Sequence, residues 1–170
     1  MTYNKDRRLE DQFAALIKNF LAQQLITKEE IKDLEEATDF AIYCVHPFKV
    51  AVRLRRFEYF KSFYDEFTIR WSRPSGVKTE IDKIREHLVD YLFYGFLSPC
   101  ETEIIQYFIA DLTKFDDVKP HHIFPNNPPD SELAVYKLSQ FPKDFVVEFY
   151  CQPSHKEVWS QNEKTARSLR

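Results

Sequence analysis

The amino-acid sequence predicts an α/β or α+β protein with a mixed, largely antiparallel sheet flanked by helices. Three observations predict this class. The chain has 170 residues, which is enough for one domain with a proper core. Hydrophobic residues make up 44% of it and aromatic residues 16%, a composition typical of folded proteins. Helical and strand-like segments both occur along the chain, which is the pattern of a sheet packed against helices.

Helical segments are recognised by apolar spacing and by capping residues. Residues 5–25 place apolar side chains on one helical face, namely Leu9, Phe13, Leu16, Ile17, Phe20 and Leu21. A second, short helix is predicted to begin at Thr27, because Thr27 and Glu30 form a capping box. Thr79 and Asp82 form a weaker box at the start of a third helix, whose buried face we expect to contain Ile81, Ile84 and Leu88.

Strands are predicted from alternation and from β-branched and aromatic content, over residues 39–45, 49–55, 66–71, 91–97, 104–112, 133–138 and 145–150. The first two are expected to form a hairpin, and in the second Arg53 and Arg55 share one face. A helix is the alternative over 104–112, and residues 57–64 fit either structure.

Proline-rich residues 113–131 are predicted to form a long exposed loop. We expect one domain over residues 1–150 and a polar, partly disordered tail over 151–170.

Composition excludes several classes of function. The net charge is -3, which disfavours a globally basic nucleic-acid binder but leaves local basic patches open. The 2 glycines exclude glycine-rich phosphate loops. The 3 cysteines are far apart and indicate reduced thiols rather than a disulfide or zinc framework. No apolar run of about 18 residues occurs, so we expect a cytoplasmic protein without a membrane span.

Three residues in the first half of the chain carry a resemblance to a known family. Glu10 lies on the first helix, Asp39 begins a strand, and Arg53 ends the tripeptide Ala51-Val52-Arg53 on the next strand. This order resembles the PD-(D/E)XK nuclease superfamily, which implies a restriction-endonuclease-like core. In that family a strand-borne Asp and the Glu of an E-x-K tripeptide bind Mg²⁺, and the Lys helps to activate water. Hard oxygen ligands suit Mg²⁺, which polarises the phosphate and acidifies bound water.

The tripeptide departs from the family pattern, because its carboxylate is missing and Arg replaces Lys. Glu80 and Lys83 lie three residues apart on the predicted third helix and offer a replacement. The resemblance therefore implies metal ligands at Asp39 and Glu80, with Glu10 in support, and a transition-state cation at Lys83 or Arg53. The alternatives are a solvated Glu10, a capping Asp39 and an ordinary helical pair of Glu80 with Lys83.

Basic and aromatic residues are interleaved between positions 53 and 78. The nucleic-acid-binding candidates are Arg55, Arg56, Arg70, Arg73 and Lys78, because arginines suit phosphate contacts and aromatics suit base stacking. The alternative is a solvent-facing sheet surface on which these cations pair with Glu58, Asp65 and Glu66.

We therefore expect a small Mg²⁺-dependent nuclease, or a nuclease-derived protein, acting on DNA or RNA. The alternative is a non-catalytic adaptor whose aromatic- and Arg-rich surface binds a protein partner or a second copy of the chain, as in a homo-oligomer. The missing carboxylate of the tripeptide favours the adaptor, and the Glu80–Lys83 pair favours the nuclease.

Overall fold

A computed structural model describes residues 8–21, 49–62, 65–116, 118–126 and 130–153. Contacts divide the chain into two compact units, Met1–Phe48 and Lys49–Arg170. Among the described residues, no helix is long and apolar enough to cross a membrane.

The first unit is described only in its helix, which covers residues 8–21. This confirms the central part of the helix predicted over 5–25. The short helix expected at Thr27 and the strand expected over 39–45 lie outside the described residues, and so does Asp39.

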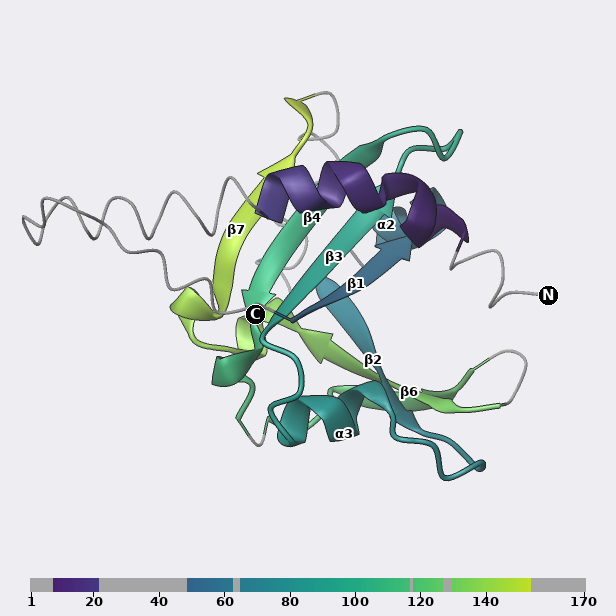
Figure 1. Ribbon diagram of the computed structural model, residues 1–170, viewed down its shortest axis with the longest axis vertical. Helices are drawn as coiled ribbons and strands as arrows, with labels where there is room; N and C mark the ends of the chain where they lie inside the picture. Colours follow the sequence, from purple (N-terminus) through teal and green to yellow (C-terminus); the bar gives the residue numbers. More distant parts are fainter. Residues whose placement is uncertain (1–7, 22–48, 63–64, 117, 127–129, 154–170) are drawn as a thin grey trace, which may run out of the picture. The chain divides into compact units, whose positions relative to one another are not determined.

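Sheet A, the larger sheet of the second unit, contains β1 (Val50–Arg55), β3 (Tyr91–Leu97), β4 (Ile104–Asp111) and β7 (Val146–Cys151) in the order β1-β3-β4-β7. The first pair is parallel and the other two pairs are antiparallel (Figure 1). All four strands confirm predicted strands, and β4 excludes the helical alternative. The predicted tail begins at the last residue of β7, and residues 154–170 lie outside the described part of the chain.

Sheet B contains β2 (Glu66–Ser72), β6 (Glu132–Lys137) and β5 (His122–Pro125) in the order β2-β6-β5, all antiparallel. The strands β2 and β6 were predicted, but the expectation of a continuous loop over 113–131 is wrong, because β5 lies inside it. A proline is tolerated there because β5 is an edge strand and Pro125 is its last residue.

Short helices connect and flank the strands. They are α2 (Phe57–Ser62), α3 (Glu80–Arg85) and the 3₁₀ turns Leu112–Lys114, Leu138–Gln140 and Lys143–Phe145. The capping box predicted before α3 is present, since Asp82 accepts hydrogen bonds from the Thr79 backbone N–H and hydroxyl at 2.8 Å each. Ile81 and Ile84 are buried as expected, but Leu88 is exposed, because the helix ends before it.

The two sheets share one hydrophobic core. Phe67 of β2 is fully buried, with its ring centroid 5.8 Å from Phe108 of β4 and 6.3 Å from Tyr94 of β3. A mixed α/β fold with a mixed, largely antiparallel sheet is therefore confirmed, and a second sheet of three strands accompanies it. The chain leaves sheet A after β1, builds α2, β2 and α3, and returns as β3, so residues of both sheets meet within one stretch of sequence.

Candidate functional site

The face of sheet A that is turned toward sheet B carries polar side chains among its aromatic ones. Arg53 pairs in register with Tyr94, and Arg55 pairs with Phe96, which in turn pairs with Gln106 of β4. Residues that pair across a sheet share a face, and so do residues two apart on one strand. Both arginines therefore lie on the face of Tyr94 and Gln106, which confirms that Arg53 and Arg55 share a side of their strand.

Sheet B contributes two side chains to the same space. Thr68 and Arg70 lie two residues apart on β2 and so on one face. The Thr68 hydroxyl lies 3.4 Å from the Tyr94 hydroxyl, a contact that joins the two sheets. Thr68, at 8% exposed, and Tyr94, at 2%, are both buried.

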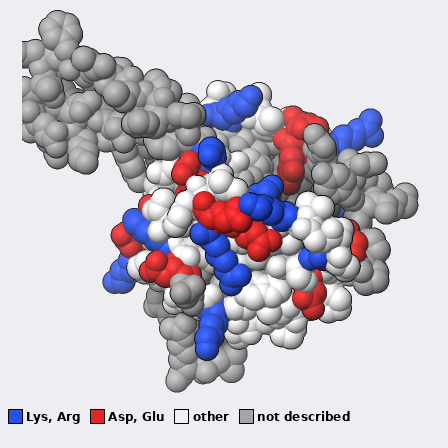
Figure 2. All heavy atoms as spheres, turned by 60° about the horizontal axis from the view of Figure 1, so that its bottom comes forward, with Lys and Arg blue, Asp and Glu red and all other residues white. Residues whose placement is uncertain are grey.

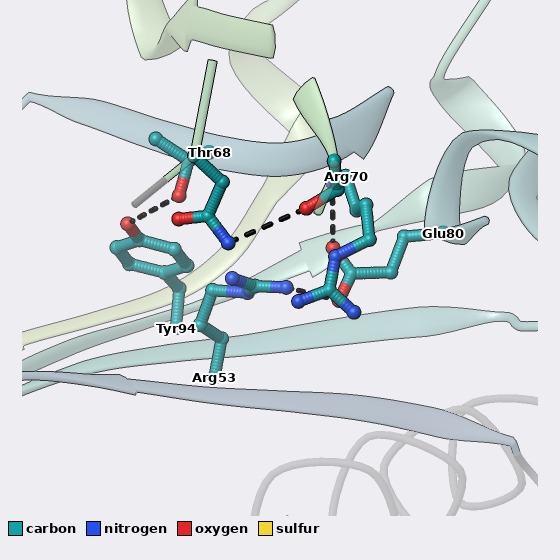
Figure 3. A network of polar contacts seen from close by, with 7 residues as sticks. Arg53, Thr68, Arg70, Glu80 and Tyr94 are labelled. Atoms are coloured by element: carbon teal, nitrogen blue, oxygen red, sulfur yellow. Dashed lines mark hydrogen bonds and ion pairs between the residues drawn. The ribbon is translucent and has the colours of Figure 1, made fainter. Parts of the chain in front are cut away.

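Glu80 joins the two sheets from the first residue of α3. One carboxylate oxygen forms an ion pair with the guanidinium of Arg53, and the other accepts the backbone N–H of Arg70 at 2.9 Å (Figure 3). The capping box at Thr79 fixes where α3 begins and so where this carboxylate projects. We call the set Arg53, Arg55, Thr68, Arg70, Glu80, Tyr94 and Gln106 the inter-sheet site.

The inter-sheet site holds Glu80 in its ionised form. Desolvation alone would raise the pKa of this carboxyl, but the charge of Arg53 and the hydrogen bond from the Arg70 N–H outweigh it. The pKa of Glu80 therefore lies below its usual value. The carboxylate acts as an anchor for two basic residues, and it is not poised to take up a proton near neutral pH.

Arg70 lies in an electrostatically unfavourable position. Burial lowers the pKa of its guanidinium, and the charges of Arg73 and Arg53 lower it further, while the charges of Glu80 and Asp130 oppose them. Its Nε atom is buried and has no hydrogen-bond partner among the residues that the structure describes. A buried donor without a partner costs about 1–3 kcal/mol. An anion between Arg70, Arg53 and Arg73 would relieve both the repulsion and the missing hydrogen bond.

The predicted metal ligands are not gathered in the described part of the chain. Asp39 lies outside it, and Glu10 belongs to the first unit. Lys83 is exposed, and the ion pair of Glu80 is with Arg53 rather than with Lys83. Over residues 8–21, 49–62, 65–116, 118–126 and 130–153, no three His, Cys, Asp or Glu residues form a group that could hold a metal ion.

The predicted nucleic-acid-binding residues fall into two groups. Arg70 and Arg55 belong to the inter-sheet site, and Arg73 lies close enough to act on Arg70 electrostatically. Arg56 instead forms an ion pair with Glu101 at 2.8 Å, and the exposed Lys78 forms one with Glu86. The described ion pairs of Arg53, Arg56 and Lys78 thus do not use the acidic residues first considered, Glu58, Asp65 and Glu66.

Three residues of the inter-sheet site were not singled out from the sequence, namely Thr68, Tyr94 and Gln106. Thr68 and Tyr94 look like ordinary strand residues in the sequence. Gln106 did carry a signal, because it is an amide inside the apolar run Ile104 to Ile109. Its side chain is fully buried, at 0% exposed, and buried polar groups require partners.

The surface near α3 differs from the inter-sheet site in its charge pattern. On the face that Figure 2 shows, acidic and basic side chains of the described residues are interleaved. This mixture agrees with the net charge of -3, and the described part of this face is not a broad basic surface.

Comparisons with protein-family models, with curated proteins and with solved structures find no match. The class of this protein is therefore described from its fold and from the inter-sheet site. It is a two-sheet α/β protein in which arginines of both sheets converge on one glutamate.

Proposed function

We propose that this protein is a nuclease or nuclease-derived protein that binds the phosphodiester backbone of nucleic acid at the inter-sheet site. The supporting observation is the half-buried side chain of Arg70. Its Nε atom is buried and has no hydrogen-bond partner among the described residues, and Arg53 and Arg73 are neighbouring positive charges. A planar guanidinium presents a fork of N–H donors that matches phosphate oxygens.

In this proposal Glu80 acts as a positioning residue. It fixes Arg53 by an ion pair and holds the β2 backbone at Arg70, so that the arginines of two sheets face one another. Two carboxylates, Glu80 and Asp130, act on Arg70 together with Arg53 and Arg73, so three arginines still leave an excess of positive charge, which suits an anionic ligand.

Mg²⁺ does not fit the described residues alone. Their single carboxylate in the site, Glu80, already accepts hydrogen bonds on both oxygens. The catalytic form of the proposal therefore requires Asp39, and it is tested by plasmid nicking with Mg²⁺ or Mn²⁺ in the wild type and in Asp39→Ala. Metal-dependent cleavage that Asp39→Ala abolishes would establish a nuclease. Binding without cleavage would establish the nuclease-derived form.

The binding proposal is tested by fluorescence anisotropy with labelled oligonucleotides over a range of salt concentrations. We expect Arg70→Lys to weaken binding about 10-fold, because the charge stays but the fork of donors is lost. Arg70→Ala should weaken binding further and reduce the salt slope by about 1.

The matched control is Lys143→Ala, which removes an exposed positive charge from the 3₁₀ turn Lys143–Phe145. This variant should bind almost as the wild type does. Equal effects of Arg70→Ala and Lys143→Ala would contradict a specific site, and a wild type that binds no oligonucleotide would overturn the proposal.

A second candidate function, partner binding, is favoured by one observation. β7 is an edge strand of sheet A, and it carries the exposed rings of Phe149 and Tyr150, at 37% and 39%. Edge strands with exposed aromatics are common contact surfaces. If a second copy of the chain binds there, light scattering should show a dimer that Phe149→Ser converts to a monomer, and a monomeric wild type would exclude self-association.

A further inference from the structure

Tyr59 is an exposed aromatic side chain on a helix that other side chains hold in place. Phe60 of α2 is fully buried and packs edge-on against Phe96 of β3, with ring centroids 5.7 Å apart. Phe57 stacks on Phe60 at 6.0 Å. Tyr59, in contrast, is 44% exposed. The helix therefore has its anchors in Phe57 and Phe60, and Tyr59 remains available for another contact.

Arg55 connects Tyr59 to the inter-sheet site. Its guanidinium carbon lies 4.3 Å from the centroid of the Tyr59 ring, a cation–π contact. Its Nε atom is buried and has no hydrogen-bond partner within the described ranges. Arg55 shares a face of β1 with Arg53, two residues away and so about 7 Å along the strand. The cationic side chains of Arg53 and Arg55 thus run from Glu80 to one face of the Tyr59 ring.

We infer that Tyr59 and Arg55 form a stacking platform for an unpaired base, so that the ligand of the inter-sheet site is single-stranded nucleic acid. This inference rests on the proposed function. An aromatic ring with an adjacent guanidinium offers a base its π-face and offers the neighbouring phosphate a cation. In a duplex the bases stack on one another inside the helix, so their faces do not reach such a ring.

The test compares three labelled ligands of equal length by fluorescence anisotropy: a single strand, the same strand with abasic sites and the corresponding duplex. For the wild type we expect the abasic strand to bind about 5- to 100-fold more weakly than the intact strand, because its phosphates remain but its bases are gone. Tyr59→Ala should lose a similar factor on the intact strand and no longer distinguish it from the abasic one. Its affinity for the duplex should equal that of the wild type.

Two variants control for effects on folding and for general loss of an aromatic ring. Tyr59→Phe keeps the ring and should bind the single strand as the wild type does. Phe124→Ala removes a partly exposed ring of β5 that is stacked on His122 rather than on an arginine, with ring centroids 6.2 Å apart, and it should leave binding unchanged. Thermal melting of each variant verifies that it is folded.

The two proposals fail in different ways. If the wild type binds intact and abasic strands equally, or if Tyr59→Ala has no effect while Arg70→Ala weakens binding, the stacking platform is overturned and the proposed function stands. If the wild type binds none of the three ligands, both are overturned. The abasic ligand keeps the inference testable even if Tyr59→Ala does not fold.

Discussion

The space between the two sheets has two ends of opposite chemistry. At one end the ring of Phe67 lies among the aromatic rings of Tyr136, Phe141, Phe108 and Phe145, with centroid distances of 5.6, 5.6, 5.8 and 6.0 Å. At the other end Arg53 and Arg70 meet Glu80. The aromatic end stabilises the fold by burying apolar area. The inter-sheet site buries charge at a cost in desolvation, which is the pattern of a binding site.

The largest expected effect comes from breaking the aromatic end. Phe67→Ala removes a fully buried ring and leaves a cavity among the neighbouring rings, so it should lower the free energy of unfolding by about 3–5 kcal/mol. Urea denaturation followed by circular dichroism measures this. Phe149→Ala, which truncates a ring that is 37% exposed, should cost less than about 1 kcal/mol. Equal costs for the two variants would contradict the difference between core and surface.

A smaller, pH-dependent effect is expected from breaking the inter-sheet site. The pKa of Glu80 lies below the usual glutamate value of about 4.3, so its ionised form contributes stability above about that pH, and this contribution is lost as the pH falls further. Glu80→Gln should cost about 1–2 kcal/mol at pH 7, a moderate value because the side chain is 35% exposed. Its stability should also fall less steeply than that of the wild type between about pH 5 and pH 3.

Glu132→Gln is the matched control for this acid sensitivity. Its carboxylate is exposed and accepts a hydrogen bond from the Ser72 hydroxyl at 2.6 Å. The acid dependence of Glu132→Gln should follow that of the wild type. An unchanged acid dependence in Glu80→Gln would show that Glu80 does not anchor the two arginines.

The smallest expected effect on the free energy of unfolding comes from removing the hydroxyl of a tyrosine at the aromatic end, Tyr136. The Tyr136 hydroxyl is buried and has no hydrogen-bond partner in the described part of the chain, and burial raises its pKa to about 12. Tyr136→Phe should therefore be neutral or stabilising by up to about 1 kcal/mol in urea denaturation. Tyr94→Phe loses the contact with Thr68 and should destabilise instead by about 0.5–1 kcal/mol. The reverse order would contradict the division between the two ends.

Most of the fold could be predicted because its strands carry their own signal. Alternation or β-branched and aromatic content located β1, β2, β3, β4, β6 and β7. Alternation marks a partly buried strand such as β1, whereas a continuous apolar run marks a buried one such as β3 or β4. The exception is β5, because its four residues include a proline and three of them are exposed, so no alternation marks it. The parallel pairing of β1 with β3 also could not be predicted from the sequence, because the choice of pairing partner depends on tertiary packing.

The inter-sheet site could be predicted only in its parts. Arg53, Arg70 and Glu80 were candidates because of their residue types, but their meeting depends on the path of the chain from β1 through sheet B and back to β3. The role of Arg70 was the least accessible to sequence analysis, because its backbone N–H, which every residue except proline has, holds Glu80. Asp39 and Glu10 remain predictions as metal ligands.

The attachment of Arg53 and Arg70 to different sheets has a thermodynamic consequence. A bound anion that touches both guanidinium groups would act as a clamp across the hydrophobic core, since it is complementary to the docked sheets and not to the unfolded chain. Such linkage raises the melting temperature as ligand is added, and at ten times Kd it amounts to about 1.4 kcal/mol. Binding of the anion at the inter-sheet site and docking of the two sheets would then be thermodynamically linked, so that each favours the other.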